Sequence, residues 1–379
     1  MSCFEITHKS SSCAARAGIF HTAHGEVETP FFMPVATKGA VKNITHPQLK
    51  EMNFDCVISN AFINYLKPGL PVIERAGGLH KFMSWDKSLF TDSGGFQLIL
   101  DHFIHKITDE GVYFKNPFDK SIELVSPKKA IHIQNSLGSD VAMCLDHQPL
   151  FGKSRADYLD SAIRTIEWAI ECKKAHEENK SKTNKDQLLF AIAQGGVHKD
   201  IRQKCALALY KIGFDAIALG GFGIGEAHQD MYSIISAVKE VLPEDNITYV
   251  MGIGSPVELL NAIASGADCF DSNYPMRMAR HGKIFTSSGY LEIEKATNKE
   301  DFSPLDKDCD CFVCKNHSRA YLHHLFKTYE QNGHVLLTYH NLYFISQLMK
   351  NTRLAIKEGR FDSFKKSFEE NFKKSKPWL

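Results

Sequence analysis

Eight short apolar segments recur along the chain, with stretches of helical character between them. They are P-F-F-M-P-V-A-T, D-C-V-I-S-N-A-F, L-F-T-D-S-G-G, D-V-A-M-C-L-D-H-Q, L-L-F-A-I-A-Q-G-G, A-I-A-L-G-G-F-G, I-T-Y-V-M-G-I-G and A-D-C-F-D-S-N. Apolar strands that alternate with helices are typical of a parallel sheet covered on both faces. Eight such units over roughly 250 residues match the size of a (β/α)8 TIM barrel. We therefore predict this α/β fold, with a doubly wound open sheet as the alternative.

Polar residues and glycines stand at or just after the ends of these segments, namely Asn60, Asp92, Asp146, Gln194, Gly221, Met251 and Asp271. In a barrel, the carboxyl ends of all strands meet on one face, where active sites are built. These residues would then converge on one pocket. The simpler alternative is that strand ends are polar in general and that each Asp caps a helix or turn.

Taken together, this inventory fits a planar base. Phe96 and Met251 offer flat apolar faces. Gln194 offers an amide, Gly221 a backbone N–H donor, and Asp146 a carboxylate acceptor. A purine-like base presents a matching edge and two faces. Asp92 and Asp271 remain, and displacement at the anomeric carbon of a sugar requires two carboxylates with separate roles.

A short basic run follows Asp271 in F-D-S-N-Y-P-M-R-M-A-R-H-G, which contains Arg277, Arg280 and His281. The 379 residues carry a formal net charge of only +1, so any contact with nucleic acid must rest on local basic charge. A strand end followed by a solvated loop is the alternative.

Seven of the ten cysteines stand singly, which does not form a disulfide framework and fits a reducing, cytoplasmic setting. The start of the chain has no apolar signal segment, and no apolar run reaches the ~18 residues of a membrane span. Cys309, Cys311 and Cys314 crowd together in C-D-C-F-V-C, which indicates a structural zinc site, with free or redox-active thiols as the alternative. The fourth ligand is open among His317, His323, His324, His334 and His340.

The regular alternation of predicted strands and helices ends after Gly282, so we predict that the chain is divided into three parts. Residues 1–282 form the barrel with the active site, residues 283–345 a zinc-binding subdomain, and residues 346–379 a basic helical tail packed on the barrel. The tail has either a solvated face or a surface that meets a polyanion. An insertion around residues 101–126 reads as a hairpin over the barrel mouth.

The chain resembles the tRNA-guanine transglycosylases, or queuine tRNA-ribosyltransferases, over nearly its whole length. The matching motifs run from T-P-F-F-M-P-V-A-T-K-G-A-V-K through R-A-G-G-L-H-K-F-M-S-W-D, T-D-S-G-G-F-Q and A-Q-G-G-V to M-G-I-G-S-P, F-D-S-N-Y-P-M-R-M-A-R-H-G and H-N-L. The resemblance implies a TIM barrel with a zinc subdomain. It also implies a homodimeric pentosyltransferase that exchanges guanine at wobble position 34 of tRNAs with GUN anticodons for a 7-deazaguanine in queuosine modification.

The resemblance also assigns roles to single residues. Asp271 is the nucleophile that attacks ribose C1′, and Asp92 is the general acid and base. The base would be held by Asp146, Gln194, the Gly221 N–H, the Phe222 carbonyl, Phe96, Met251 and Asn60. Arg277 and Arg280 would lie near tRNA phosphates. The family pattern selects His340 as the fourth ligand of one structural zinc per chain, with no organic cofactor.

Three departures from the family wording concern the pocket and a neighbouring segment. His147-Gln148 stands where Glu-Cys is usual, S-N-A-F-I-N-Y-L replaces N-T-Y-H-L, and Ile224 is bulky. They leave open whether the incoming base is preQ1, queuine or another 7-deazaguanine. The alternatives are a related exchange enzyme acting on another tRNA position or on DNA, and a non-catalytic tRNA-binding partner subunit.

Overall fold

Eight parallel strands form the centre of the molecule. The structure is a computed structural model that describes residues 3–93, 104–116, 118–180, 186–222 and 227–372. The strands are β4 (Phe31–Pro34), β5 (Cys56–Asn60), β6 (Ser88–Asp92), β10 (Val141–Met143), β11 (Leu188–Ala193), β12 (Ala216–Leu219), β13 (Thr248–Val250) and β14 (Cys269–Ser272). They pair in the order β4-β14-β13-β12-β11-β10-β6-β5. A parallel bridge between Val35 and Ile58 brings the two outer strands together.

This bridge answers the question between barrel and open sheet. The amide of Ala36 donates to the carbonyl of Ile58 at 2.7 Å, and the Ser59 hydroxyl donates to the Ala36 carbonyl at 2.8 Å. The sheet therefore comes round on itself as a nearly closed barrel, and the predicted TIM-like fold is confirmed. Each of the eight predicted apolar segments contains one of its strands.

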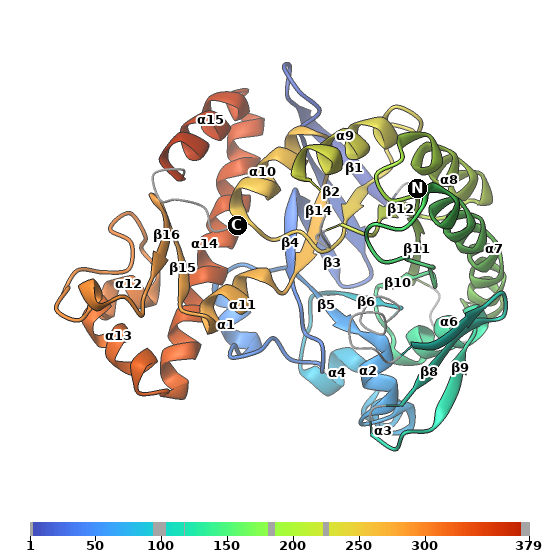
Figure 1. The fold of residues 1–379 in the computed structure, drawn as a ribbon, viewed down its shortest axis with the longest axis horizontal. Helices are drawn as coiled ribbons and strands as arrows, with labels where there is room; N and C mark the ends of the chain where they lie inside the picture. Colours follow the sequence, from blue (N-terminus) through green and yellow to red (C-terminus); the bar gives the residue numbers. More distant parts are fainter. Residues whose placement is uncertain (1–2, 94–103, 117, 181–185, 223–226, 373–379) are drawn as a thin grey trace.

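Helices surround the barrel on the outside (Figure 1), and two of those near the site begin at a side-chain cap. Those that position the site are α2 (Ala61–Leu66), α6 (Pro127–Leu137), α7 (Arg155–Lys180), α8 (Lys199–Ile212), α9 (His228–Lys239), α10 (Pro256–Ala264) and α11 (Tyr274–Arg280). Asn60 caps α2 and Ser126 caps α6, and α6 ends at Gly138, which has a φ of 72°.

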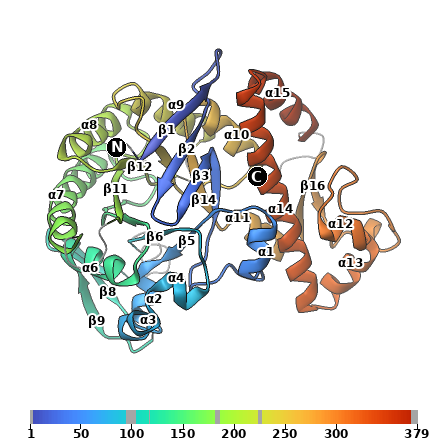
Figure 2. The same cartoon turned by 180° about the vertical axis from the view of Figure 1, so that it is seen from behind.

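A three-stranded antiparallel sheet covers the amino-terminal end of the barrel (Figure 2). It consists of β1 (Phe4–Lys9), β2 (Arg16–Thr22) and β3 (Gly25–Thr29). The fully buried Phe20 ring lies 6.2 Å from Phe31 and 5.9 Å from both Phe90 and Phe190, measured between ring centroids. These rings fill the base of the barrel, so the opposite end is left for the site.

The insertion before β10 is a sheet of three strands, in which the predicted hairpin is extended by one further strand. It contains β7 (Ile104–Thr108), β8 (Gly111–Lys115) and β9 (Ile122–Val125). Phe114 packs edge-on against Phe62 of α2 at 4.2 Å, and the Trp168 indole of α7 donates to the Asp109 carbonyl at 2.6 Å. The insertion is therefore packed against the helices α2 and α7.

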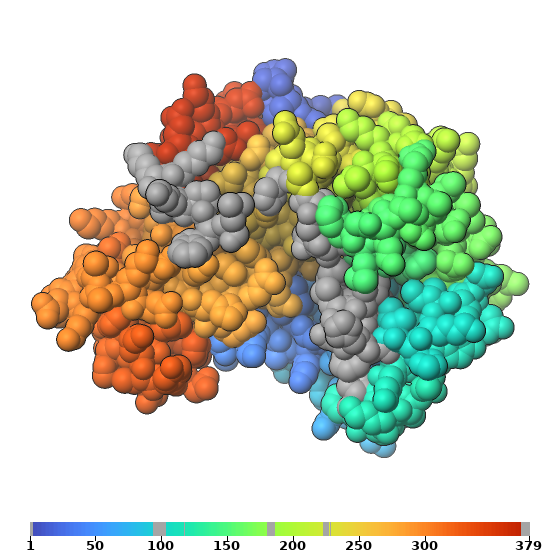
Figure 3. Space-filling view, in the orientation of Figure 1, coloured from blue at the N-terminus to red at the C-terminus, as the bar shows by residue number. Residues whose placement is uncertain are grey.

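Residues 283–372 form a lobe on one side of the barrel (Figure 3). It contains β15 (Lys283–Thr286), β16 (Gly289–Glu292), α12 (Phe312–Asn316), α13 (Arg319–Lys327), α14 (Gln331–Lys357) and α15 (Phe361–Phe372). Helix α14 runs along the side of the lobe that faces the barrel (Figures 1 and 2), and Arg353 donates to the Pro30 carbonyl at 2.9 Å. The division at residues 283 and 346 stays a prediction, and α14 runs unbroken across the second of these points.

Among the residues that the structure describes, none of the helices is both long enough and apolar enough to cross a membrane.

Candidate active site

Asp271 stands near the end of β14 and accepts two hydrogen bonds on one oxygen. The Tyr249 hydroxyl donates to Oδ1 at 2.6 Å, and the Gly252 amide donates to the same oxygen at 3.2 Å. Burial of the carboxyl raises the pKa of Asp271, while the two donors favour its ionised form. The result is an oriented carboxylate at the carboxyl end of the barrel, as a nucleophile requires.

Asp92 ends β6, directly opposite Asn60 of β5 in the parallel pair. The Asn60 amide donates to Asp92 Oδ2 at 3.3 Å, while its oxygen accepts from the Ile63 amide at 2.7 Å. The helix cap therefore fixes the direction of the Asn60 side chain and aims its N–H at Asp92. Asn60 was predicted among the base-binding residues, and the structure places it as a partner of Asp92.

The two carboxylates face the same interior. Phe90 lies two residues before Asp92 on β6, so both side chains point to one face of the sheet. The ring of the fully buried Tyr249 is 5.8 Å from that of Phe90, and its hydroxyl reaches Asp271. Burial, followed by the charge of Asp271 and, more weakly, that of Asp92, raises the pKa of Tyr249 well above its usual value. The Tyr249 hydroxyl therefore stays protonated and donates its hydrogen bond to Asp271.

A second polar pair lies on the neighbouring strands. The Gln194 amide, just after β11, donates to Asp146 Oδ2 at 2.6 Å. Burial raises the pKa of Asp146 to about 6, against the lowering effect of the Gln194 hydrogen bond. A Cβ added at Gly220 would lie 2.8 Å from Gln194 Nε2, and one added at Gly221 would lie 3.3 Å from Gln194 Oε1. The glycines after β12 therefore let the backbone approach this pair closely.

The loops after β12 and β13 meet between the two pairs. A Cβ added at Gly252 would lie 3.2 Å from the carbonyl oxygen of Phe222, and Gly252 has a φ of 83°. Met251 is half-buried, and its amide donates to the Leu219 carbonyl at 3.1 Å. Phe96 and Ile224, both singled out from the sequence, lie outside the described residues.

Arg277 and Arg280 lie on α11, which follows β14, the strand that carries Asp271. The Arg277 guanidinium is exposed and stands 5.6 Å from the ring centroid of Tyr274. Burial and the charge of Arg277 lower the pKa of Arg280, and the charges of Arg280 and Lys42 contribute to lowering the pKa of His334. Basic groups from three separate segments therefore gather beside the site.

Three residues that hold the site together were not predicted from the sequence, namely Tyr249, Ser272 and Arg202. Tyr249 lies inside an apolar strand, where it reads as a core residue. Ser272 accepts from the Tyr274 amide at 3.1 Å and donates to the Gly252 carbonyl at 3.2 Å, which ties the end of β14 to the next loop. Arg202 reads as one of many surface cations of an amphipathic helix, yet it is fully buried.

The three clustered cysteines converge on one histidine. The distances from His340 Nδ1 to the sulfur atoms of Cys309, Cys311 and Cys314 are 3.8, 3.4 and 3.3 Å. His340 Nε2 lies 2.7 Å from the Phe285 carbonyl, so this nitrogen carries the proton and Nδ1 presents its lone pair. The four ligand atoms lie within 4.8 Å of one another, which fits a tetrahedral metal site.

A second group also brings three ligand-type atoms together, those of His24, His80 and Asp140. His80 Nδ1 lies 3.2 Å from the Gly138 carbonyl, and Nε2 lies 3.1 Å from the Lys87 carbonyl and 3.2 Å from Asp140 Oδ2. Both ring nitrogens thus face acceptor oxygens, as in a hydrogen-bond network. This network fastens the β2–β3 turn to the amino-terminal end of the barrel.

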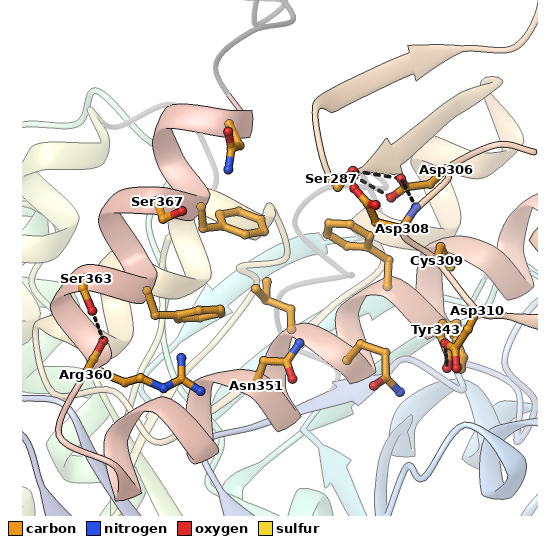
Figure 4. Close-up of a pocket in the computed structure, with 16 residues that line it drawn as sticks. Ser287, Asp306, Asp308, Cys309, Asp310, Tyr343, Asn351, Arg360, Ser363 and Ser367 are labelled. Carbon is orange, nitrogen blue, oxygen red and sulfur yellow. Dashed lines mark hydrogen bonds between the residues drawn. The ribbon is translucent and has the colours of Figure 1, made fainter.

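A cavity of about 580 Å³ (Figure 4) is lined neither by the carboxylates Asp92 and Asp271 nor by the pair Asp146 and Gln194. Helices α14 and α15 and the loop around Asp306 and Asp308 line it. Among the described residues predicted for the site, the metal ligand Cys309 alone reaches it. A search for the active site by cavity size alone would therefore select this cavity and not the polar residues at the strand ends.

Comparison with known proteins agrees with the geometry. The model of the family "Queuine tRNA-ribosyltransferase" matches residues 11–374. A queuine tRNA-ribosyltransferase of Fusobacterium nucleatum is 46% identical over 361 residues, covering 94% of this chain and 95% of the relative. One from Caldanaerobacter subterraneus is 45% identical over 366 residues, covering 96% of each chain. One from Geobacillus kaustophilus is 41% identical over 374 residues, covering 99% of this chain and 97% of the relative. With matches of this extent, the chain belongs to the queuine tRNA-ribosyltransferase family.

Proposed function

We propose that this chain is a tRNA-guanine transglycosylase, which exchanges guanine in tRNA for a 7-deazaguanine in queuosine modification. The observation that carries this is the pair Asp92 and Asp271. They stand at strand ends of one barrel face, each with its own set of hydrogen-bond donors. Base exchange at a ribose requires one carboxylate that attacks and another that moves protons.

In the reaction, guanine at the wobble position is flipped out of the anticodon into the pocket. The Asp146 carboxylate accepts N–H bonds from the base edge, and the Gln194 amide and the Gly221 N–H complete the recognition. The Phe222 carbonyl faces the substituent at position 7, and Phe96 and Met251 cover the two faces of the ring. Asp146 and Gln194 are already paired at 2.6 Å, so the acceptor is oriented before the base arrives.

Asp271 then attacks ribose C1′ while the C1′–N9 bond to guanine breaks and Asp92 protonates the departing base. The covalent Asp271–ribose ester holds the tRNA while guanine leaves. Asp92 removes the proton from N9 of the incoming 7-deazaguanine, which attacks C1′ and releases Asp271. Two inversions at C1′ give net retention, and the reaction needs no organic cofactor.

Binding of tRNA rests on local charge. Arg277 and Arg280 would hold phosphates beside the flipped nucleotide, and an exposed guanidinium can form bidentate contacts with phosphate. We further propose a homodimer, on the family resemblance, and a cytoplasmic setting, which the unpaired cysteines favour.

For the metal site we propose one structural zinc per chain. Three thiolates and one imidazole fill all four positions of a tetrahedral ion, so none is left open for a substrate. The zinc would stabilise the lobe and take no part in base exchange.

The direct test is incorporation of labelled guanine into unmodified tRNA by the wild type, Asp271→Asn and Asp92→Asn. We expect Asp271→Asn to lose exchange and to form no denaturation-resistant complex with tRNA, since an amide cannot form the ester. Full exchange by Asp271→Asn would remove the nucleophile assignment. A wild type inactive on every tRNA would point to a partner subunit, and exchange into another tRNA position or DNA to the related enzyme class. Competition between preQ1 and queuine would identify the incoming base.

A further inference from the structure

Arg202 is a fully buried cation directly behind the residues that read the base. It lies in the first turn of α8, and its side chain turns back beneath the loop that joins β11 to this helix. Nη1 donates to the Ala193 carbonyl at 2.5 Å, and Nε donates to the Gly196 carbonyl at 2.8 Å. The guanidinium therefore holds the backbone on both sides of Gln194.

The same guanidinium also meets the loop after β12. Its central carbon lies 4.9 Å from the ring centroid of Phe222, and Nη2 lies 3.4 Å from where a Cβ on Gly221 would be. Arg202 and these two residues line one small cavity together with Gln148 and Gln194. One side chain thus spans the two loops whose separation sets the width of the base-reading edge.

Burying a guanidinium is expensive, and packing alone would favour an apolar residue of similar length. The Ala193 and Gly196 carbonyls and the Phe222 ring offset part of this cost. Asp146, which accepts a hydrogen bond from Gln194, lies within electrostatic reach of the guanidinium. The charge of Arg202 therefore acts on Asp146 in addition to the hydrogen bonds that the guanidinium donates.

We propose that Arg202 is the positioning residue of base recognition, which sets the spacing of the Gln194 and Gly221–Phe222 loops and keeps the Asp146 carboxyl ionised to accept the base. This inference rests on the proposed function and concerns the step before the chemistry. Arg202 need not touch the base, because it acts through Asp146, Gln194 and the two loops.

The electrostatic surroundings of Asp146 agree with this role. Its pKa is raised to about 6 by burial, and the charge of Arg202 is among the effects that oppose this rise. Burial raises the pKa of the nearby Cys144 and Cys205 thiols, which keeps both neutral. Burial also lowers the pKa of the adjacent His147 to about 4, so this ring is neutral as well. Of the cations around this group, Arg164 acts on His147, Lys173 acts on Cys144, and Arg202 acts on Asp146.

The test measures equilibrium binding of labelled guanine between pH 5 and 8 to the full-length wild type, Arg202→Met and Arg202→Lys. The exposed Lys204 of the same helix gives the matched control Lys204→Met. For Arg202→Met we expect the Kd for guanine at pH 7.5 to rise about tenfold and the loss of binding in acid to begin about one pH unit higher. Arg202→Lys should weaken guanine binding, because lysine lacks the planar guanidinium that donates to two carbonyls at once. It should keep the wild-type pH midpoint, because lysine keeps the positive charge.

Arg202→Met with wild-type affinity at every pH would overturn the proposal, as would an equal shift of the midpoint in both variants. If Arg202→Met does not fold, Arg202→Lys decides: weakened binding with an unshifted midpoint supports the proposal, and wild-type binding refutes it. A wild type that binds no guanine would instead refute the proposed function. The two failures are therefore distinct.

Discussion

At the scale of single residues, Tyr249 orients Asp271, the proposed nucleophile. Its hydroxyl donates to Asp271 at 2.6 Å, and its ring is held by Phe90 in the barrel interior. Tyr249→Phe keeps the ring and removes the donor, so we expect kcat for guanine exchange to fall about 10- to 100-fold with little change in KM. Losing a donor to the ionised form raises the pKa of Asp271, so the acid limb of kcat should move to higher pH. Tyr65→Phe, which removes a hydroxyl bonded to Glu123, is the control, and equal effects in both variants would contradict the role of Tyr249.

The site residues predicted from the sequence share one property that Tyr249 and Arg202, two of those missed, do not. Asn60, Asp92, Asp146, Gln194 and Asp271 stand where an apolar run gives way to polar residues, so the barrel rule alone brings them to one face. Tyr249 and Arg202 act from inside a strand and a helix. Nothing in their local sequence separates a buried functional group from an ordinary core or surface residue. Their roles follow only from three-dimensional contacts.

At the scale of elements, the loop after β13 holds the end of β14. A Cβ added at Gly254 would lie 2.7 Å from Ser272 Cβ and 2.9 Å from Tyr274 Cβ, closer than such atoms pack. Gly254→Ala should therefore push this loop and the Gly252 amide away from Asp271. We expect it to destabilise the protein by about 1–3 kcal/mol in urea unfolding and to lower kcat. Gly138→Ala, at a helix end where an added Cβ meets no atom within 4 Å, should cost stability but leave kcat unchanged. A wild-type kcat for Gly254→Ala would refute the coupling.

Sequence periodicity predicts some of these elements and not others. The eight barrel strands are short, apolar and bounded by polar turns, so their number and order were predictable. The strands β1 and β3 of the amino-terminal sheet and the strand β7 of the insertion are antiparallel, partly exposed and mixed in composition. Their place depends on contacts such as that of Phe20 with three barrel rings, which no local pattern contains.

At the scale of the whole molecule, the cysteine and histidine cluster and helix α11 share one anchor. His340 is followed on α14 by Asn341, whose amide donates to the Pro275 and Lys283 carbonyls at 3.1 and 3.0 Å. Asn341 Oδ1 also accepts from the Phe285 amide at 3.0 Å. The first of these partners lies on α11, which carries Arg277 and Arg280. Order in the lobe is therefore transmitted directly to the basic run beside the site.

Removing the metal should consequently separate the two binding activities. In Cys311→Ser, or after chelation, we expect a lower Tm and a Kd for tRNA raised about tenfold or more, because the lobe no longer holds α11 in place. Guanine binding should change much less, since Asp146 and Gln194 lie across the barrel and are fixed by their own strands. Cys13→Ser, at a half-exposed cysteine outside the cluster, is the control. A protein shown by elemental analysis to be metal-free, with unchanged Tm and tRNA affinity, would refute the structural role of the metal. Equal losses of guanine and tRNA binding would show that the lobe supports the whole barrel and not α11 in particular.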